Sequence, residues 1–261
     1  MKIARFSHND GIRYGILDDS DIVVLDGDPM FAGFEPTGER VPLADVALLA
    51  PVIPRSKVVC VGRNYHDHAA EFGNVAPEEP LLFLKPNTAV IGPGDSIVRP
   101  PISERTEFEG ELVAVIGRIA KNVTAENALD YVFGYTIGND VTARDLQRKD
   151  GQWTRGKGFD TFCPLGPIIE TEFDAASARL QTRVNGDVRQ DARLTDMIHS
   201  VADIIAYASA VFTLLPGDVI LTGTPAGVSE IVAGDSIEIE IGGIGVLRNT
   251  VRDATSTAPA A

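Results

Sequence analysis

Short runs of aliphatic and β-branched residues, bounded by turn-forming residues, recur along this chain, and this pattern limits its possible folds most strongly. From Lys57 onward, such runs lie at Val58–Val61, Leu81–Leu84 and Glu111–Ile116. They are typical of strands, because β-branched side chains pack well on a pleated, half-buried surface. Segments with helical periodicity are few. We therefore predict a β-rich α+β fold instead of an alternating βαβ sheet.

Two segments predict individual strands in more detail. Leu180–Val184 and Val188–Gln190 flank Asn185-Gly186, a pair that favours the tight turn of a β-hairpin. Within Ile237–Ile241, isoleucine alternates with glutamate. That alternation predicts a strand with one buried and one solvated face.

Helices are predicted at two places. Thr124–Tyr131 begins with a threonine that is a candidate N-cap. Ser200 is a candidate cap for a second helix over Val201–Leu214, whose apolar residues recur at helical spacing on one face. Both segments fit the minority of helices that an α+β fold contains.

The chain is predicted to divide near its first prolines. Its first part reads as short strands joined by tight turns, and Pro51 and Pro54 mark a boundary after them. We predict a small N-terminal β-rich domain over residues 1–55 and a main domain over residues 56–254. Residues 255–261 lack core-forming side chains and are expected to form a flexible tail.

Charge and composition exclude several classes of protein. The formal net charge is −14, which would repel nucleic acid and an anionic membrane surface. No apolar stretch reaches the length of a membrane span, and the N-terminus does not resemble a secretory signal. Cys60 and Cys163 lie far apart among apolar neighbours, as buried free thiols do in a reducing compartment. We therefore expect a cytoplasmic protein.

A pair of glutamates is the first candidate for a functional site. In a strand, alternate side chains share a face, so Glu109 and Glu111 would lie beside Val113 and Val115. Two carboxylates this close repel each other and lose hydration unless a cation or protons neutralise them. Oxygen ligands alone favour Mg²⁺, Mn²⁺ or Ca²⁺ over zinc. The alternative is that Glu107 and this pair line a solvated strand face.

Asp140 is a candidate third ligand. It follows an apolar, β-like run and precedes a segment that could form a short helix from about Thr142. Ligand-binding side chains are commonly presented at such strand ends. The alternative is that Asp140 only caps that helix.

A histidine and a glutamate form the second candidate site. If Asn64–Gly73 contains a short helix, His68 and Glu71 are three residues apart and face the same side. A carboxylate beside an imidazole fixes its tautomer and raises its basicity, as a general base requires. The alternatives are a surface turn and a zinc site that includes His66, whose spacing fits no standard zinc pattern.

Six blocks of the chain, in this order, resemble the fumarylacetoacetate hydrolase superfamily. They are Val59–Glu71, Pro80–Pro86, Glu109–Leu112, Gly138–Gln147, Trp153–Lys157 and Leu221–Val228. The resemblance covers roughly Lys57 to Val251 and favours the functional interpretation of each motif over the structural one. It implies a mixed β-roll with a small N-terminal β-rich domain, assembled as a homodimer, as in the small bacterial members.

The resemblance also implies roles for individual residues. Glu109, Glu111 and Asp140 match the ligands of Mg²⁺ or Mn²⁺, which leaves Glu107 outside the metal site. The catalytic residues implied are His68 and Glu71, an acid–base pair on a lid, and Lys157. The substrate contacts implied are Gln147, Thr224, Arg63 and Tyr65.

The implied activity is cleavage of a C–C bond in a small anionic 2-oxo acid through a metal-stabilised enolate. Acylpyruvate hydrolysis and oxaloacetate decarboxylation both fit. One alternative is an isomerase or decarboxylase of the 2-hydroxyhepta-2,4-diene-1,7-dioate type in aromatic-acid catabolism. An alternative of another class is a metal-dependent binding protein without turnover, for which the His68–Glu71 pair would have no use.

Overall fold

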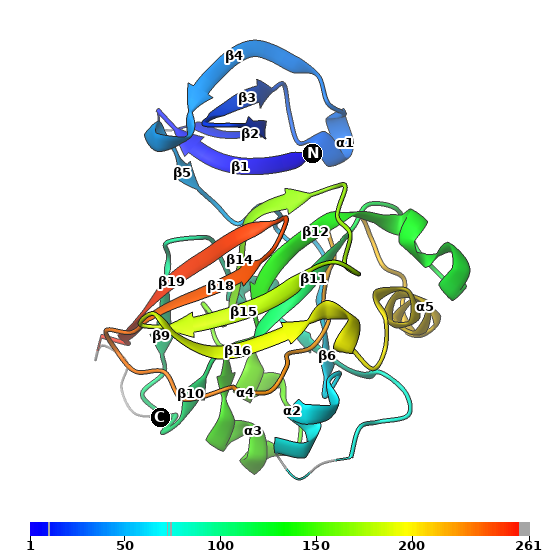
Figure 1. Cartoon of the computed structure of the whole chain (residues 1–261), viewed down its shortest axis with the longest axis vertical. Helices are drawn as coiled ribbons and strands as arrows, with labels where there is room; N and C mark the ends of the chain where they lie inside the picture. Colours follow the sequence, from blue (N-terminus) through cyan, green and yellow to red (C-terminus); the bar gives the residue numbers. More distant parts are fainter. Residues whose placement is uncertain (10, 72, 74, 256–261) are drawn as a thin grey trace.

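The computed structural model describes residues 1–9, 11–71, 73 and 75–255. Two large sheets dominate this part of the chain, and the helices are short (Figure 1). The N-terminal strands lie at one end of the molecule, and helices α2, α3 and α4 lie at the opposite end. The β-rich α+β class predicted from the sequence is confirmed.

The larger sheet runs through both parts of the chain. Its main path is β4 (Pro36–Pro42), β3 (Asp21–Leu25), β2 (Gly11–Asp18), β1 (Lys2–His8), β14 (Cys163–Glu170), β12 (Val132–Asn139), β11 (Gly110–Ile116), β17 (Val219–Leu221), β6 (Val58–Gly62) and β7 (Leu81–Lys85). Two short strands join its sides, β5 (Ala47–Leu48) on β1 and β8 (Val90–Ile91) on β14. Because β1 pairs with β14, the N-terminal strands continue the main sheet. The predicted division near residue 55 stays a prediction.

The second sheet covers one face of the first. Its order is β16 (Asp187–Arg193), β15 (Arg179–Val184), β18 (Ser236–Ile241), β19 (Gly245–Asp253) and β9 (Ser96–Arg99). A third, small sheet pairs β10 (Thr106–Glu107) with β13 (Thr142–Ala143). Leu112 of β11 and Ile239 of β18 share the core between the large sheets, and Val113 packs into a second core on the other face. Strand β11 is therefore buried on both sides.

The two detailed strand predictions are confirmed. Strands β15 and β16 form the expected hairpin, and both turn residues, Asn185 and Gly186, have positive φ angles of 53° and 87°. Strand β18 alternates between buried isoleucines and half-buried neighbours. The thiols of Cys60 and Cys163 are free and buried, as expected.

One of the two helix predictions needs correction. Helix α5 (Val201–Val211) is capped by Ser200, whose Oγ accepts a hydrogen bond from the Asp203 amide at 3.2 Å. The other segment forms a 3-10 helix, η3 (Ala125–Tyr131), and Thr124 makes no capping hydrogen bond. Without that hydrogen bond, the threonine does not satisfy the amides of the first turn. The remaining helices are α1 (Pro29–Ala32), α2 (His66–Glu71), α3 (Arg144–Asp150), α4 (Thr154–Lys157), η1 (Leu43–Asp45), η2 (Asn87–Ala89) and η4 (Leu194–Asp196).

Two further sequence predictions concern the C-terminal tail and membrane-spanning segments. The predicted flexible tail lies, apart from Thr255, outside the described residues. Within the described part of the chain, no helix is long and apolar enough to cross a membrane.

Candidate metal centre and active site

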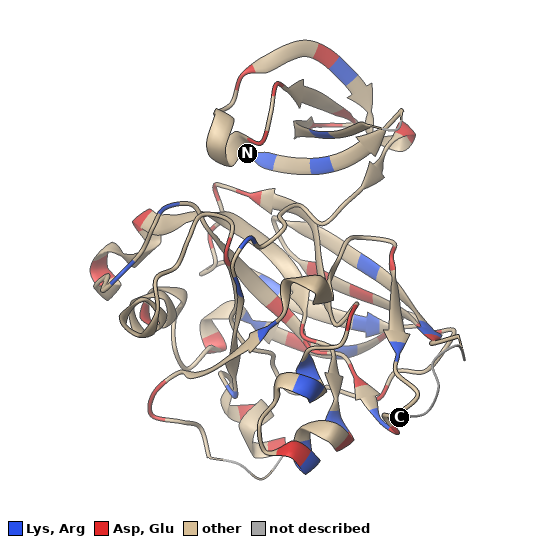
Figure 2. Cartoon of the chain, turned by 180° about the vertical axis from the view of Figure 1, so that it is seen from behind, with Lys and Arg blue, Asp and Glu red and all other residues tan. Residues whose placement is uncertain are grey.

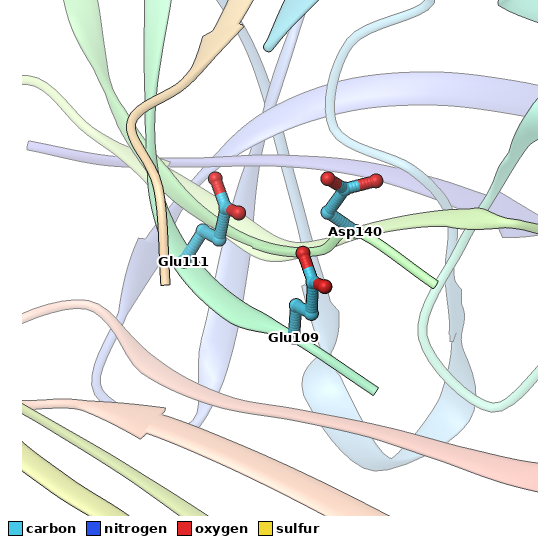
Figure 3. Close-up of side chains that lie close together, drawn as sticks. All are labelled: Glu109, Glu111 and Asp140. Atoms are coloured by element: carbon cyan, nitrogen blue, oxygen red, sulfur yellow. The ribbon is translucent and has the colours of Figure 1, made fainter. Parts of the chain in front are cut away.

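The pairing of β11 with β12 brings the three candidate metal ligands together. The register sets Gly110 opposite Asn139, and the Asp140 amide donates to the Glu109 carbonyl at 2.8 Å. Glu109 directly precedes β11, and Glu111 is the second residue of that strand. One carboxylate oxygen from each of Glu109, Glu111 and Asp140 lies within 4.8 Å of the others. The three side chains face one shared space (Figure 3).

The two structural alternatives for these acids are wrong. Glu107, Glu109 and Glu111 are 0%, 4% and 1% exposed, so they do not line a solvated face. Asp140 is 1% exposed and does not cap α3, which begins at Arg144 after Ala143. The glutamates share the face of Val113, away from the second sheet, and there Arg144 of α3, Lys157 of α4 and the Gly223 amide contact them in place of water.

Two lysines neutralise part of this buried charge. The Lys157 ammonium lies 2.7 Å from a Glu109 oxygen and 2.6 Å from an Asp140 oxygen. The Lys85 ammonium donates to the other Asp140 oxygen at 2.5 Å and to the Val141 carbonyl at 3.1 Å. Asp140 is thus held between two ammonium groups that enter from different elements, β7 and α4.

An arginine joins the cluster to Glu107. Arg144 donates to Glu109 at 2.5 Å and to Glu107 at 2.6 Å. Arg105 contacts the other Glu107 oxygen at 2.6 Å. Glu107 is outside the three-carboxylate group, as the resemblance implied, but it fixes the arginine that contacts one member of it. It is therefore part of the ion-pair network.

The three carboxyl groups differ in electrostatic environment. Burial, followed by the charges of Asp140 and Glu109, raises the pKa of Glu111 well above its usual range. Burial also acts to raise the pKa of Glu109, but Lys157 and Arg144 outweigh it and lower that pKa. Glu111 is therefore the acid whose charge the protein leaves uncompensated. Three oxygen donors with one uncompensated carboxylate fit a hard divalent cation such as Mg²⁺ or Mn²⁺.

The candidate acid–base pair lies on α2. The Nδ1 atom of His68 is 3.4 Å from a Glu71 oxygen, and the other Glu71 oxygen accepts from the Gly227 amide at 3.3 Å. Burial lowers the pKa of His68 and outweighs the nearby charge of Glu109, which acts to raise it. A neutral imidazole is the form that can accept a proton. The geometry therefore suits a general base.

A cavity of about 490 Å³ joins these groups. Among the residues predicted from the sequence, its walls contain Arg63, His68, Glu109, Glu111, Gln147, Lys157 and Thr224. Asp140 and Glu71 are not part of the described wall, but they contact Lys157 and His68, which are. Tyr65 is 3% exposed and is not part of the described cavity wall.

The turn after β17 forms one side of the site. The Gly223 amide donates to Glu111 at 2.7 Å, and the Thr224 hydroxyl donates to the Gly110 carbonyl at 2.9 Å. Gly223 has a φ of 98°, and a Cβ there would approach the Cβ of Asn64 to 2.6 Å. Only glycine therefore allows this turn to pass so close to Asn64 at the end of β6.

The sequence interpretation missed three residues of this network: Lys85, Arg144 and Gln190. Lys85 and Arg144 stand within blocks that carry the family resemblance, so their positions held a usable signal. The Gln190 amide donates to the Thr224 hydroxyl and the Pro225 carbonyl, both at 2.7 Å, and accepts from Gly110 at 3.1 Å. Nothing in the sequence near Gln190 indicates this role.

Two family models match this chain and together cover most of it. The model described as "Fumarylacetoacetate (FAA) hydrolase C-terminal" matches residues 57–252. The model described as "Rv2993c-like, N-terminal" matches residues 1–51.

Curated relatives are similar over most of the chain. Protein Rv2993c of Mycobacterium tuberculosis is 52% identical over 96% of this chain and 98% of its own length. The human mitochondrial oxaloacetate tautomerase FAHD2A is 43% identical over 80% of this chain and 71% of its own length.

Solved structures agree with these matches. The 2-hydroxyhepta-2,4-diene-1,7-dioate isomerase of Mycobacterium marinum has a TM-score of 0.91 at 48% identity, covering 98% of this chain and 100% of that one. The maleylpyruvate hydrolase of Sphingobium sp. SYK-6, in complex with manganese(II) and pyruvate, has a TM-score of 0.81 at 33% identity, covering 98% and 100%. From its sequence and its fold alike, this chain belongs to the fumarylacetoacetate hydrolase family.

Proposed function

We propose that this protein is a Mg²⁺- or Mn²⁺-dependent enzyme that cleaves a C–C bond of a small 2-oxo acid, by hydrolysis or decarboxylation. The observation that supports this most directly is the group of three buried carboxylates beside a cavity that also holds His68. A related hydrolase binds manganese(II) and pyruvate, which is the product that such a cleavage would release. When bound, the cation would supply a Lewis acid for the negative charge that develops at the 2-oxo group.

The positive groups of the cavity wall would assist this charge separation. The ammonium of Lys157 is buried between Glu109 and Asp140, and the two carboxylates outweigh the effect of burial and raise its pKa. It is therefore charged at neutral pH. A fixed positive charge in a site with little water stabilises a developing anion without having to reorient.

His68 and Glu71 would serve hydrolysis. His68 would take a proton from a water molecule as that water attacks the distal carbonyl of an acylpyruvate, and later return it to the leaving carbon. Glu71, 3.4 Å from Nδ1, would orient the ring and stabilise its protonated form. In a decarboxylation, carbon dioxide leaves and no attacking water is required.

A second candidate activity is isomerisation of an unsaturated 2-hydroxy dioate or tautomerisation of a 2-oxo acid. It is supported by the relatives named for these reactions, at 48% and 43% identity. The same cavity residues could move a proton along the substrate carbon chain without breaking a bond. A binding protein without turnover remains the proposal of another class, and a cytoplasmic homodimer remains our expectation for the state in the cell.

A substrate screen tests the proposal. Protein stripped with EDTA would be assayed with and without added Mg²⁺ or Mn²⁺ on acetylpyruvate, oxaloacetate and an unsaturated 2-hydroxy dioate, with the reaction followed by absorbance. We expect metal-dependent loss of acetylpyruvate or oxaloacetate. Metal-dependent conversion of the dioate alone would favour the isomerase, and saturable binding without turnover would favour the binding protein. Full activity in EDTA would disprove the metal-dependent mechanism.

A further inference from the structure

Helix α3 lays one face along the cavity from its inner end to its mouth. Arg144, Gln147, Arg148 and Gly151 all form part of the cavity wall. Gln147 and Arg148 lie three and four residues after Arg144, which is the spacing of one helical face, and Gly151 follows the last residue of α3. Arg144 is buried and contacts Glu109. Arg148 comes one turn later, about 5–6 Å further along the helix, and is exposed at the mouth.

A second arginine of the cavity wall, Arg63, comes from a different element. Arg63 directly follows β6 and has a φ of 59°, a conformation that few residues other than glycine adopt. Asn64 fixes this turn, because its buried amide donates to the carbonyls of Thr222 at 2.7 Å and His199 at 3.0 Å. Backbone strain that persists at a site indicates that the surroundings impose it. The strained turn places Arg63 in the cavity wall, with its guanidinium 5.9 Å from the Trp153 ring centre.

The inner and outer positive charges differ in their partners. Arg144 and Lys157 each contact carboxylates of the protein. Among the described residues, no salt bridge involves Arg63 or Arg148, although acids outnumber bases by 37 to 23 in the whole chain. Figure 2, again with the N-terminal strands at the top, shows Lys and Arg positions among the helices at the opposite end. In the described part of the chain, the mouth therefore presents two guanidinium groups that form no salt bridge.

We infer that Arg63 and Arg148 receive a second carboxylate, at the far end of the substrate, and that the enzyme prefers 2-oxo dioates to 2-oxo acids with an apolar end. This rests on the proposed function, which places the 2-oxo carboxylate at the inner metal centre. A planar guanidinium suits a carboxylate, because its N–H groups can form two parallel hydrogen bonds. An apolar substrate end would gain nothing from either arginine.

Binding of two unreactive probes of equal chain length tests the inference apart from catalysis. 2-Oxoglutarate and 2-oxovalerate both have five carbons and a 2-oxo acid group, but only the first ends in a carboxylate. Their dissociation constants would be measured by calorimetry on the full-length protein in Mg²⁺. We expect the dioate to bind the native protein at least about tenfold more tightly, the effect of one well-placed charge-assisted hydrogen bond.

Variants assign that preference to the arginines. Arg148→Gln and Arg63→Gln should each weaken dioate binding about tenfold and change 2-oxovalerate binding less than about twofold, and Arg148→Lys should retain part of the preference. Lys149→Gln is the matched control, because it removes the same charge from the next position of α3, outside the described cavity wall. It should leave both dissociation constants unchanged.

The outcomes separate this inference from the proposed function. Equal affinity for the two probes, equal losses for both probes in Arg148→Gln, or an equal effect of Lys149→Gln would overturn the inference and leave the metal centre standing. If neither probe bound in Mg²⁺, or if EDTA weakened the binding of neither probe, the proposed function itself would fail.

Discussion

The inner end of the cavity and its mouth use positive charge in opposite ways. At the inner end, Lys85, Lys157 and Arg144 are buried and each contacts an acid of the protein. At the mouth, Arg63 and Arg148 have no salt bridge among the described residues. Buried charges need partners because they have lost water, whereas exposed ones keep their hydration until a ligand replaces it. The charged side chains of the inner end are thus held in place before a ligand binds, whereas the guanidinium groups at the mouth are available to bind one.

The largest effect on activity is expected at Glu111, the inner carboxylate that forms no salt bridge among the described residues. Glu111→Gln keeps the size of the side chain and removes the charge that a cation would need. We expect activity to fall by about a thousandfold, since a metal ion contributes several kcal/mol to a transition state and each 1.36 kcal/mol is tenfold. Steady-state assays with Mg²⁺ titrated to saturation would measure this. Activity within threefold of the native protein would remove Glu111 from the metal centre.

The charge network predicts that replacing two of the candidate ligands, Asp140 and Glu111, changes the stability of the protein by different amounts. Asp140→Ala leaves Lys85 and Lys157 buried without one of their acids, and breaking a buried pair costs about 3–5 kcal/mol. Glu111 has no cation as its direct partner among the described residues, so Glu111→Gln should change stability far less. Urea unfolding of the metal-free variants would measure both. Equal losses would show that the network does not distinguish them.

Replacement of His68 tests whether this residue activates water or only positions the substrate. If His68 activates water, His68→Gln should lower acylpyruvate hydrolysis by about 10²- to 10⁴-fold, the usual contribution of a general base. Oxaloacetate decarboxylation should change by less than tenfold, because no water attacks. Both rates would be measured on one preparation. Equal losses on the two substrates would assign His68 to positioning.

The smallest expected effect is on how the stability of the metal-free protein depends on pH. Because the pKa of Glu111 is raised in the folded state, the folded protein binds more protons than the unfolded chain above the usual glutamate value of about 4.3. Its contribution to stability is present below that value and is lost as pH rises through the folded pKa. The lowered pKa of His68 acts in the opposite direction, so the prediction is a difference between two proteins. Between about pH 5.5 and pH 8, metal-free native protein should change in stability less favourably than metal-free Glu111→Gln. An equal change in the two proteins, measured by urea titrations, would contradict the assignment.

The sequence predicted those features that depend on short spacing. Alternation within Ile237–Ile241 and the Asn185-Gly186 turn predicted strands that the structure contains. The spacing of Glu109 and Glu111 predicted the carboxylate pair. Asp140 was a candidate from its place after an apolar run, and the family resemblance favoured that interpretation over a helix cap. In these cases neighbours along the chain determine the geometry.

The features that were missed depend on contacts between distant segments. Gln190 lies on β16, an edge strand on which it is the sole fully buried residue, and it reaches Thr224 and Gly110 across the sheets. From its sequence, the strand looks solvated. Lys85 likewise ends a strand, where a lysine usually faces water. Its burial follows from Asp140, which lies 55 residues away.

The single face of α3 has a consequence for how this family can diversify. Position 144 touches the inner acids, whereas position 148, one turn later, touches only the mouth. A point mutation at position 148 can therefore change which substrates a descendant accepts without disturbing the inner residues. Insertion of one residue between the two would rotate the later part of the helix by about 100° and remove it from the cavity. Substitutions along α3 therefore keep the same helix face in the cavity wall, whereas a one-residue insertion does not.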